Sequence, residues 1–258
     1  MSNIIPKYIF IIPYRNRQYQ KQHFDIYIKY LLEDYDKNDY LIYYSHQCDY
    51  RSFNRGAVKN IGFLAMKKEY PNNYKDIIFI FNDIDTMPYI KNTFNYYTKK
   101  GEIKHFYGFE FALGGIFSIT GEDFEKINGF PNYWGWGLED NCIKLRADYY
   151  KIIINRDNFL KYKDAKVLQF DIQNEKIVTT NAMAIYKNRN IFLNCGLKSL
   201  INIDFIINNS MIDIKSFDDY FIKFENEKFK IKDIKLTGNK MKDIDKFYLN
   251  SKFKMNIN

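Results

Sequence analysis

Two aspartates stand two positions apart at the end of an apolar run. Asp83 and Asp85 follow the segment 76–81, whose sequence is Asp-Ile-Ile-Phe-Ile-Phe, and Ile84 separates them. In an extended backbone such side chains point to the same face, and in a turn they converge. Paired carboxylates of this kind bind a hard divalent cation that bridges phosphate oxygens. Because Asp-x-Asp is also a common solvated turn, the pair alone leaves both interpretations open.

A second group of residues combines aromatic rings, glycines and acids. The segment 134–140 is Trp-Gly-Trp-Gly-Leu-Glu-Asp, and it holds both tryptophans of the chain. Glycines let the backbone approach a ligand closely, indole faces stack on sugar rings, and acids accept hydrogen bonds from hydroxyls. Glu139 and Asp140 stand at a predicted helix start, which stabilises their ionised forms and slightly weakens them as bases. The alternative is that these acids only cap the helix and that the tryptophans are core residues.

Arginines follow the first two apolar runs. The segment 13–17 is Pro-Tyr-Arg-Asn-Arg, and Phe53-Asn54-Arg55 comes after the second run. Arginines in loops at the edge of a sheet bind a diphosphate through forked, charge-assisted hydrogen bonds. Each of these segments is unspecific alone. Together with the aspartate pair they occupy successive strand ends, which an open α/β sheet brings to one rim.

The elements that position these groups alternate between strands and helices over the first 150 residues, which predicts an α/β sheet. We expect strands at 8–12, 40–44, 76–81, 106–111, 116–119 and 166–170. We expect helices at 18–32, 57–68, 121–128 and 139–149. Further along, 183–192 is predicted to be helical and 200–224 to hold two or three strands.

Composition is typical of a folded domain. A chain of 258 residues with 46% apolar residues can bury a sizeable core, and 27% charged residues argue against disorder. The 23 Tyr and 23 Phe accompany an excess of Ile, Asn and Lys, so we give the aromatic content little functional weight.

The positive charge is concentrated at the end of the chain. Of the net charge of +8, a surplus of five comes from 226–258, which holds nine Lys against four acidic residues. We therefore divide the chain into a catalytic domain at 1–225 and a lysine-rich extension at 226–258. Such a charge run favours an acidic partner, a membrane face or nucleic acid, but most charge runs are solvated. Because no nucleic-acid recognition motif appears, we expect no specific nucleic-acid partner.

Cysteine usage and hydropathy bear on the compartment. Cys48, Cys142 and Cys195 lie far apart without CxxC spacing, which predicts neither a disulfide framework nor a cysteine-based zinc site. No apolar stretch approaches the roughly 20 residues that a membrane helix needs, and the N-terminus lacks a signal-peptide pattern. We expect a soluble cytoplasmic protein without a transmembrane segment.

Taken in order, these segments resemble the β-1,4-galactosyltransferase family, the inverting glycosyltransferases of family 7. The order and spacing of the segments carry the resemblance, together with the rare Trp-Gly-Trp-Gly string, and similarity extends to about residue 225. The matching segments are 11–17, 53–57, 81–88, 114–115, 128–132, 134–140 and 196–200.

The resemblance implies a GT-A fold, in which a Rossmann-like mixed sheet flanked by helices binds a nucleotide sugar. It also implies an enzyme that transfers a hexose from a UDP-sugar to a glycan or glycoprotein hydroxyl with inversion, and Mn²⁺ as cofactor. The residues that would bind the nucleotide sugar are Pro13, Tyr14, Arg15, Arg17, Phe53, Arg55, Asp83, Ile84, Ala112, Gly115 and Trp136.

The same resemblance assigns the metal, the acceptor and the base. Asp85 would ligate the metal, and Asp140 would take the acceptor proton as general base. Glu139 would act beside it at the catalytic centre. The residues that would contact the acceptor are Trp136, Glu139, Asp140 and Asn141.

Departures from the family pattern concern the metal site. The family has a metal-binding histidine after the catalytic segment, and this chain has no histidine beyond His105. By position, Asp171 or Gln169 would stand there, and we prefer Asp171. An oxygen ligand is harder than imidazole, so Mg²⁺ would compete better with Mn²⁺. The alternative is a weakened metal site in a degenerate member that binds UDP-sugar or glycan without turnover.

Further departures concern the donor and the acceptor. Ala112 stands three residues before Gly115, where galactose-using members carry a bulky Tyr that limits the space at carbon 2 of the sugar. A small side chain leaves room for an N-acetyl group, so N-acetylgalactosamine is an alternative to galactose. Leu138 replaces a glycine and Asn141 replaces an acid of the acceptor site. Neither the acceptor nor the oligomeric state follows from the sequence.

Overall fold

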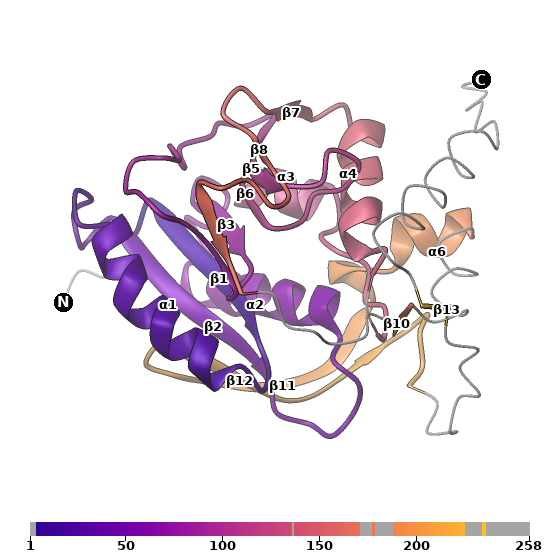
Figure 1. Cartoon of the computed structure of the whole chain (residues 1–258). Coiled ribbons are helices and arrows are strands. Elements are labelled where there is room, and N and C mark those ends of the chain that lie inside the picture. Colours follow the sequence, from indigo (N-terminus) through magenta and orange to yellow (C-terminus); the bar gives the residue numbers. More distant parts are fainter. Residues whose placement is uncertain (1–3, 136, 171–176, 179–187, 225–233, 236–258) are drawn as a thin grey trace.

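The structure, a computed structural model, describes residues 4–135, 137–170, 177–178, 188–224 and 234–235 (Figure 1). Within these ranges nine strands form one mixed sheet. They are β1 (Tyr8–Tyr14), β2 (Tyr40–Gln47), β3 (Ile78–Asn82), β5 (Glu102–Gly108), β6 (Ile116–Thr120), β7 (Ile153–Asn155), β8 (Leu160–Lys161), β11 (Leu200–Asn208) and β12 (Met211–Asp219). The order across the sheet is β11-β12-β2-β1-β3-β6-β5-β7, with β8 also paired to β5.

Strand direction changes across the sheet. β2 and β3 run parallel to β1 on either side, and β12 runs parallel to β2. β6 is antiparallel to both β3 and β5, whereas β11 and β12 form an antiparallel hairpin. The carboxyl ends of β1, β2 and β3 therefore share one edge, and the loop before the antiparallel β6 returns to that same edge.

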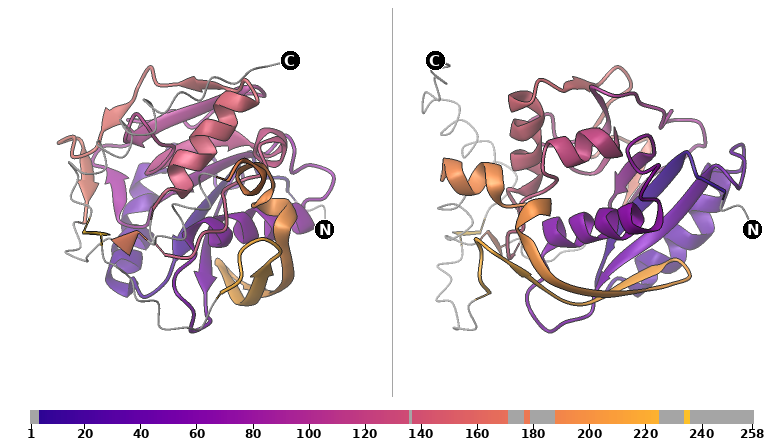
Figure 2. Two further views of the ribbon diagram at one scale, coloured as in Figure 1. Left: turned by 90° about the vertical axis from the view of Figure 1, so that its right-hand side faces the viewer. Right: turned by 180° about the vertical axis from the view of Figure 1, so that it is seen from behind.

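Helices cover both faces of the sheet. α1 (Gln18–Leu31) lies across one face in Figure 1, whereas α2 (Arg55–Glu69) and α4 (Glu139–Tyr149) lie on the opposite face, which the right-hand view of Figure 2 brings to the front. Successive side chains of β1 point to opposite faces of the sheet, so they contribute to two separate hydrophobic cores. Ile9 and Ile11 join the core under α2, and Phe10 and Ile12 join the core under α1.

Smaller elements complete the chain. β4 (Thr86–Pro88) pairs with β9 (Val167–Gln169), and β10 (Ile177–Val178) pairs with β13 (Ile234–Lys235). α3 (Gly121–Lys126) follows β6 and packs on the α2 side through Phe124. The short helix α6 (Arg189–Asn194) and the 3₁₀ turn η1 (Leu197–Ser199) precede β11.

The predicted α/β architecture is confirmed, and most elements lie where the sequence pattern put them. The helices predicted at 18–32 and 139–149 correspond to α1 and α4, and the strand predicted at 8–12 extends to Tyr14. Two strands fill 200–224, as expected.

One predicted strand is displaced, and one predicted helix is only partly described. The strand expected at 106–111 runs from Glu102 to Gly108, because Gly108 adopts φ +138 and turns the chain out of the sheet. The helix expected at 183–192 begins at Arg189 within the described residues, and 183–187 lie outside them. The very short strands β4, β7 and β8 were not predicted, because two or three residues show no readable period.

The division at residue 225 stays a prediction. Of the proposed lysine-rich extension, only Ile234 and Lys235 are described. All three cysteines are free, as the spacing predicted. In the described part of the chain, every helix is too short or too polar to cross a bilayer.

Candidate functional site

A cavity of about 270 Å³ opens at the shared edge of β1, β2 and β3. Its walls come from strand-end loops that lie far apart in the sequence. The lining residues are Pro13, Arg15, Arg17, Phe53, Arg55, Asp83, Ile84, Asp85, Thr86, Tyr107, Gly108, Phe109, Phe111, Ala112, Gly114, Gly115, Gly137, Leu138, Glu139, Asp140, Asn141, Tyr162 and Gln169.

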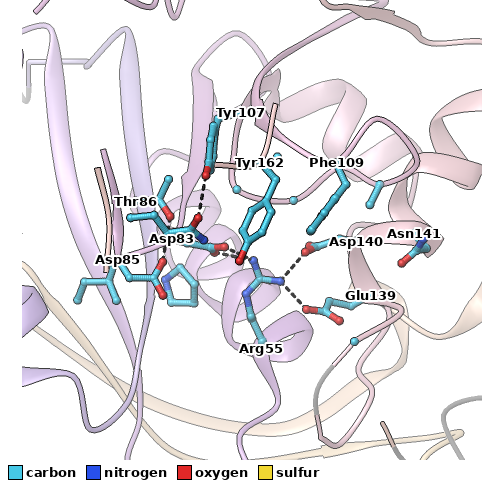
Figure 3. A pocket seen from close by; sticks show the side chains of 18 of the residues that line it. Arg55, Asp83, Asp85, Thr86, Tyr107, Phe109, Glu139, Asp140, Asn141 and Tyr162 are labelled. Carbon is cyan, nitrogen blue, oxygen red and sulfur yellow. Dashed lines mark hydrogen bonds and ion pairs between the residues drawn. The ribbon is translucent and has the colours of Figure 1, made fainter. Parts of the chain in front are cut away.

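Arg55 occupies the middle of this cavity (Figure 3). Its Nη2 lies 2.5 and 2.6 Å from the two carboxylate oxygens of Asp83, and its Nη1 lies 2.7 Å from Asp140 Oδ2. The same Nη1 also donates to Glu139. Burial by itself lowers the pKa of Arg55, but Asp140, Asp83 and Glu139 outweigh it and hold that pKa above its usual value. One guanidinium thus joins the loop after β3 to the start of α4.

A network of buried amides places Arg55. Asn54 precedes α2 as its N-cap, and its side chain accepts from the backbone N–H of Ala57 at 2.9 Å. The side-chain Nδ2 of Asn54 donates to the backbone carbonyl of Asn132 at 2.9 Å. The side-chain Nδ2 of Asn60 donates to Asn132 Oδ1 at 2.8 Å. These bonds fix the first turn of α2 against the loop that leads to Trp134.

Lys59 stands one helical turn after Arg55 and points to the same carboxylates. Its side chain is 1% exposed. Its Nζ lies 3.5 Å from Asp140 Oδ1, 3.8 Å from Asp83 Oδ1 and 4.5 Å from the ring centre of Phe130. We call Arg55, Lys59, Asp83, Glu139 and Asp140 the cavity cluster. Two basic side chains from one helix face three carboxylates in it.

The backbone near β6 allows Asp140 to approach closely. The Leu113 amide donates to the Asp140 carbonyl at 2.8 Å. A Cβ on Gly114 would lie 2.4 Å from Asp140 Oδ2, so a larger residue there would displace the Asp140 carboxylate. Glu139 is buried, and burial followed by the neighbouring Asp140 raises its pKa. Leu138, which precedes both acids, adopts φ +70, a conformation that favours the glycine found there in the family.

Asp85 lies at the opposite side of the cavity from α4 (Figure 3). Its carboxylate accepts from Thr86 Oγ1 at 3.0 Å, and burial followed by Asp83 raises its pKa. Gln169 reaches this region because β9 pairs it with Thr86, and its Oε1 accepts from the Tyr107 hydroxyl at 2.8 Å. A half-buried carboxylate with a raised pKa, with amide and hydroxyl oxygens nearby, is a donor set that fits a hard divalent cation.

A buried histidine fixes the glycine pair beside the cavity. His105 Nε2 lies 3.0 Å from the Gly114 carbonyl, and Arg156 Nε donates to His105 Nδ1 at 3.1 Å. Burial and then Arg156 lower the pKa of His105 to about 4, so the ring is neutral and Nε2 carries the proton. At Gly115, φ is +70 and a Cβ would lie 2.4 Å from the Tyr107 carbonyl. His105 is therefore a structural residue rather than a metal ligand.

Three aromatic rings form one wall of the cavity. Phe109 stacks on Phe111 with ring centres 5.0 Å apart and on Tyr162 with ring centres 4.6 Å apart. Phe109 and Tyr162 point into the space above Arg55 in Figure 3. Such a wall offers flat apolar faces next to charged groups, which suits a sugar or a base.

Comparison with known sequences identifies the family. A family model described as the N-terminal region of glycosyl transferase group 7 matches residues 4–100, and one described as the N-terminal domain of galactosyltransferase matches residues 98–168. Together they cover more than half of the chain. The chain belongs to the β-1,4-galactosyltransferase family. The resemblance inferred from its motifs is thereby confirmed.

Individual galactosyltransferases match over the same region. β-1,4-Galactosyltransferase 4 of Cricetulus griseus is 37% identical over 165 residues, which is 57% of this chain and 44% of that protein. β-1,4-Galactosyltransferase 1 of Bos taurus is 34% identical over 163 residues, which is 59% of this chain and 39% of that protein. The matched region spans less than half the length of these relatives.

Solved galactosyltransferase structures share the fold. A mutant of Drosophila β-1,4-galactosyltransferase 7 in complex with manganese, UDP-Gal and xylobiose superposes with a TM-score of 0.65 at 19% identity, over 82% of this chain and 94% of that one. The catalytic domain of the same Drosophila enzyme with xylobiose gives a TM-score of 0.65 at 20% identity, over the same shares of the two chains.

Most residues assigned by the galactosyltransferase resemblance meet in this one cavity. It brings together Pro13, Arg15, Arg17, Phe53, Arg55, Asp83, Ile84, Asp85, Ala112, Gly115, Glu139, Asp140 and Asn141. Their individual roles stay predictions. Trp136 and Asp171 lie outside the described residues, whereas Gln169, the other candidate for the metal position, lines the cavity.

Tyr14 does not line the cavity. The alternation along β1 turns its ring to the α1 face, where it packs 6.3 Å from Tyr44 and 4.9 Å from His46. Trp134 is likewise a packing residue, because its indole stacks on Phe217 of β12 with ring centres 5.4 Å apart. The ring of Tyr14 therefore lies apart from the other assigned residues, and its place in the nucleotide site stays a prediction.

Several residues in or beside the cavity were missed from the sequence. Lys59 had a readable signal, because it is a lone charge on the apolar face of a predicted helix, four residues after Arg55. The aromatic wall had none, because Phe109, Phe111 and Tyr162 are three among 46 Phe and Tyr residues. Only the fold brings Tyr162 next to the loop after β5.

Proposed function

We propose that this galactosyltransferase family member is a metal-dependent, inverting enzyme that transfers galactose or N-acetylgalactosamine from a UDP-sugar to a glycan hydroxyl. The observation that carries the proposal is the cavity cluster, in which Asp83 at one end and Glu139 and Asp140 at the other share Arg55. A donor-side acid and two acceptor-side acids across one cavity are what a direct transfer between two substrates needs.

The charges around the cavity support a diphosphate donor. Arg15, Arg17, Arg55 and Lys59 supply four positive charges, and Asp83, Asp85, Glu139 and Asp140 supply four negative ones. A diphosphate together with a divalent cation adds little net charge to this balance. The arginines hold phosphate oxygens by forked hydrogen bonds, and they stabilise the charge that develops on the leaving group.

Metal dependence rests on the donor set around Asp85. Asp85 would hold the cation, with Gln169 or Asp171 as a further oxygen ligand, and Mn²⁺ or Mg²⁺ is the ion that suits such ligands. A bound divalent cation supplies charge that neutralises the departing diphosphate. Burial and then Asp83 raise the pKa of Asp85, and a bound cation would lower that pKa again by stabilising the ionised carboxylate.

Asp140 is the proposed general base. Its carboxylate faces the cavity at the first turn of α4, 21% exposed, and it is held by Arg55 and by the backbone contact with Leu113. It would accept the proton of the acceptor hydroxyl as oxygen attacks the sugar from the face opposite the diphosphate, which inverts the configuration. Glu139 and Asn141 would orient the acceptor, and the aromatic wall would exclude water from the sugar.

The donor sugar is open between two hexoses. Ala112 lines the cavity and is buried, and its methyl group is a small side chain at this position of the wall. A bulkier residue there would fill space next to Gly115. The small side chain leaves room for an N-acetyl group, so N-acetylgalactosamine is the alternative to galactose as the transferred sugar.

The second candidate is a binding protein without turnover. The absence of a histidine after His105 favours it, because the family's metal ligand is replaced. The retained carboxylates Asp85, Glu139 and Asp140 oppose it.

UDP release across a panel of UDP-sugars, with Mn²⁺, Mg²⁺ or EDTA and with simple sugar acceptors, tests both candidates. We expect release that needs a divalent metal, that an acceptor stimulates, and that is fastest with UDP-galactose or UDP-N-acetylgalactosamine. UDP binding without turnover of any donor would favour the binding protein. Failure to bind UDP at all would overturn the proposal.

A further inference from the structure

A second group of polar side chains lies one strand away from the cavity, where β2 ends beside β12. His46 Nδ1 is 2.9 Å from Asp213 Oδ1, Cys48 Sγ is 3.4 Å from His46 Nδ1, and Cys48 Sγ is 3.7 Å from Asp213 Oδ1. We call these three residues the sheet-edge cluster. An imidazole nitrogen, a thiol and a carboxylate thus converge on one point.

The ladder between β2 and β12 explains why they converge. Asp213 stands opposite His46 in the parallel register, and Cys48 follows two residues after His46 on the same face. The Cys48 amide also donates to the Ile214 carbonyl at 2.9 Å. The backbone under all three groups is therefore fixed before any ligand arrives.

The three separations fit a tetrahedral metal. Zinc–sulfur and zinc–nitrogen bonds of about 2.3 and 2.0 Å at tetrahedral angles place neighbouring ligand atoms roughly 3.3–3.6 Å apart. The two distances from Cys48 Sγ are within about 0.2 Å of that range. Only the 2.9 Å distance between His46 Nδ1 and Asp213 Oδ1 must lengthen slightly when a metal binds. A thiolate with an imidazole and one carboxylate selects a borderline metal such as Zn²⁺ over Mg²⁺ or Mn²⁺.

We propose that His46, Cys48 and Asp213 bind a divalent transition metal of the Zn²⁺ class, with a fourth coordination position open to solvent. The His46 and Asp213 side chains are each 28% exposed and Cys48 is exposed, so an ion can enter. The site is separate from the Asp85 region, and it does not depend on the proposed transfer reaction. Cysteine spacing alone did not reveal it, because only one ligand is a cysteine and one comes from a distant strand.

Metal binding at this site releases a proton. The thiol of Cys48 gives up its proton on forming the metal–sulfur bond, and the proton goes to solvent. Burial and then Asp213 raise the pKa of Cys48, whereas Lys215 on the same face of β12 lowers it. Asp49 is held by Arg51, with Nε 2.7 Å from its Oδ2, so it does not complete the coordination. The neighbouring ring of Tyr14 shields one side of His46.

The site lies at the base of a loop that serves the cavity. Gln47, between His46 and Cys48, donates to the Ser52 carbonyl at 3.1 Å and accepts from the Asn54 amide at 2.9 Å. Arg15 donates to the Arg51 carbonyl in the same loop. A metal on Cys48 would therefore brace the loop that carries Phe53 to the cavity wall.

Native-state alkylation of the full chain tests the proposal, because Cys48 is exposed whereas Cys142 and Cys195 are buried. Iodoacetamide should label Cys48 selectively, as mass spectrometry can verify. Zn²⁺ at ten times its dissociation constant should slow that labelling about tenfold, because only one protein in roughly eleven then has a free site. Co²⁺ titration should give a sulfur-to-metal charge-transfer band that Cys48→Ser abolishes.

Two variants decide whether the three side chains act together. His46→Ala and Asp213→Asn should each remove most of the protection, whereas Asp204→Asn, an exposed carboxylate on β11, should leave it unchanged. Equal protection in His46→Ala, Asp213→Asn and wild type would mean that the thiol alone binds metal and would overturn the proposal. Absence of protection in the folded wild-type protein would reduce the cluster to an ion pair between His46 and Asp213.

Discussion

The cavity cluster and the sheet-edge cluster are neighbours on one sheet, yet their charges are balanced in different ways. In the cavity cluster, the basic side chains of Arg55 and Lys59 reach three carboxylates from successive turns of α2. In the sheet-edge cluster, Asp213 faces a histidine and a thiol, whose charges depend on pH or on a bound metal.

The difference separates a preformed site from a site completed by its ligand. Fixed cations hold Asp83, Glu139 and Asp140 in place without substrate, so catalysis need not reorganise them. The sheet-edge cluster gains its positive charge only when a cation arrives. Substitutions in the cavity cluster should therefore change turnover, whereas those in the sheet-edge cluster should change metal-dependent stability.

The largest effect is expected from removing the proposed base. Asp140→Asn should lower turnover at least about 10²-fold, the usual scale for a lost general base, and should leave UDP-sugar affinity nearly unchanged. Steady-state kinetics together with a UDP-sugar titration measure both quantities. Asp148→Asn, an exposed carboxylate later in α4 that pairs with Lys144 at 2.8 Å, is the matched control. Turnover of Asp140→Asn within threefold of wild type would exclude the assigned role.

The second largest effect is expected from replacing Asp85. Among the described residues, no basic side chain forms an ion pair with this carboxylate. Asp85→Asn should raise the Mn²⁺ concentration for half-maximal activity at least about tenfold, because a charged ligand is lost. Metal titrations of UDP release measure this. Gln169→Ala and Asp171→Ala, titrated alongside, show which residue is the further ligand.

Without metal, the same substitution should stabilise the protein. A raised pKa means that the folded state favours protonated Asp85, so its contribution to stability is lost as pH rises through that pKa. At pH 7.5 in EDTA, Asp85→Asn should raise Tm by about 2–4 °C, which corresponds to roughly 1 kcal/mol. An unchanged or lower Tm would show that Asp85 bears no such penalty.

Lys59 tests whether the second fixed cation matters. Lys59→Met keeps the volume and removes the charge 3.5 Å from Asp140, so protons should compete better for the carboxylates of the cavity cluster. The acidic limb of the pH profile of kcat/KM should move up by about one pH unit, with a loss of activity near tenfold at low pH and below threefold at high pH.

Lys59→Arg separates a positioning role from a structural one. It keeps the charge and should return the acidic limb toward the wild-type position, even if it lowers Tm. If Lys59→Met lowers Tm but leaves the pH profile unchanged, Lys59 only fills the space beside Phe130.

The sequence predicted the site residues at strand ends better than the residues that form the cavity walls between those ends. Arg15, Arg55, Asp83 and Asp140 follow or begin recognisable elements, and parallel strands bring such positions to one edge. Their meeting was therefore predictable from periodicity and from the family resemblance. Tyr14 does not meet them, because the period of two along β1 turns its ring to the other face of the sheet.

Long-range pairing accounts for contacts that no local pattern indicates, including that of Gln169, which only the family resemblance singled out. Gln169 enters the cavity only because the three-residue strand β9 pairs with β4, and Asp213 meets His46 only through the register of β12 on β2. Neither contact leaves a local signal, since both depend on residues more than 80 positions apart. Lys59 did leave one, as a charge among Ala57, Val58 and Ile61 on α2.

The sheet-edge cluster should affect stability rather than turnover, and this effect should depend on pH. Zn²⁺ at ten times its dissociation constant should raise Tm by about 3–6 °C, which corresponds to roughly 1.4 kcal/mol. At a fixed Zn²⁺ concentration this increase should grow from pH 6 to pH 8, because the metal must displace the proton of Cys48, whose pKa is raised. Thermal unfolding of wild type and Cys48→Ser measures it, and the increase should vanish in the variant. An increase that is the same at both pH values would mean that the stabilising ion binds oxygen ligands, and the contrast between the two clusters would then disappear.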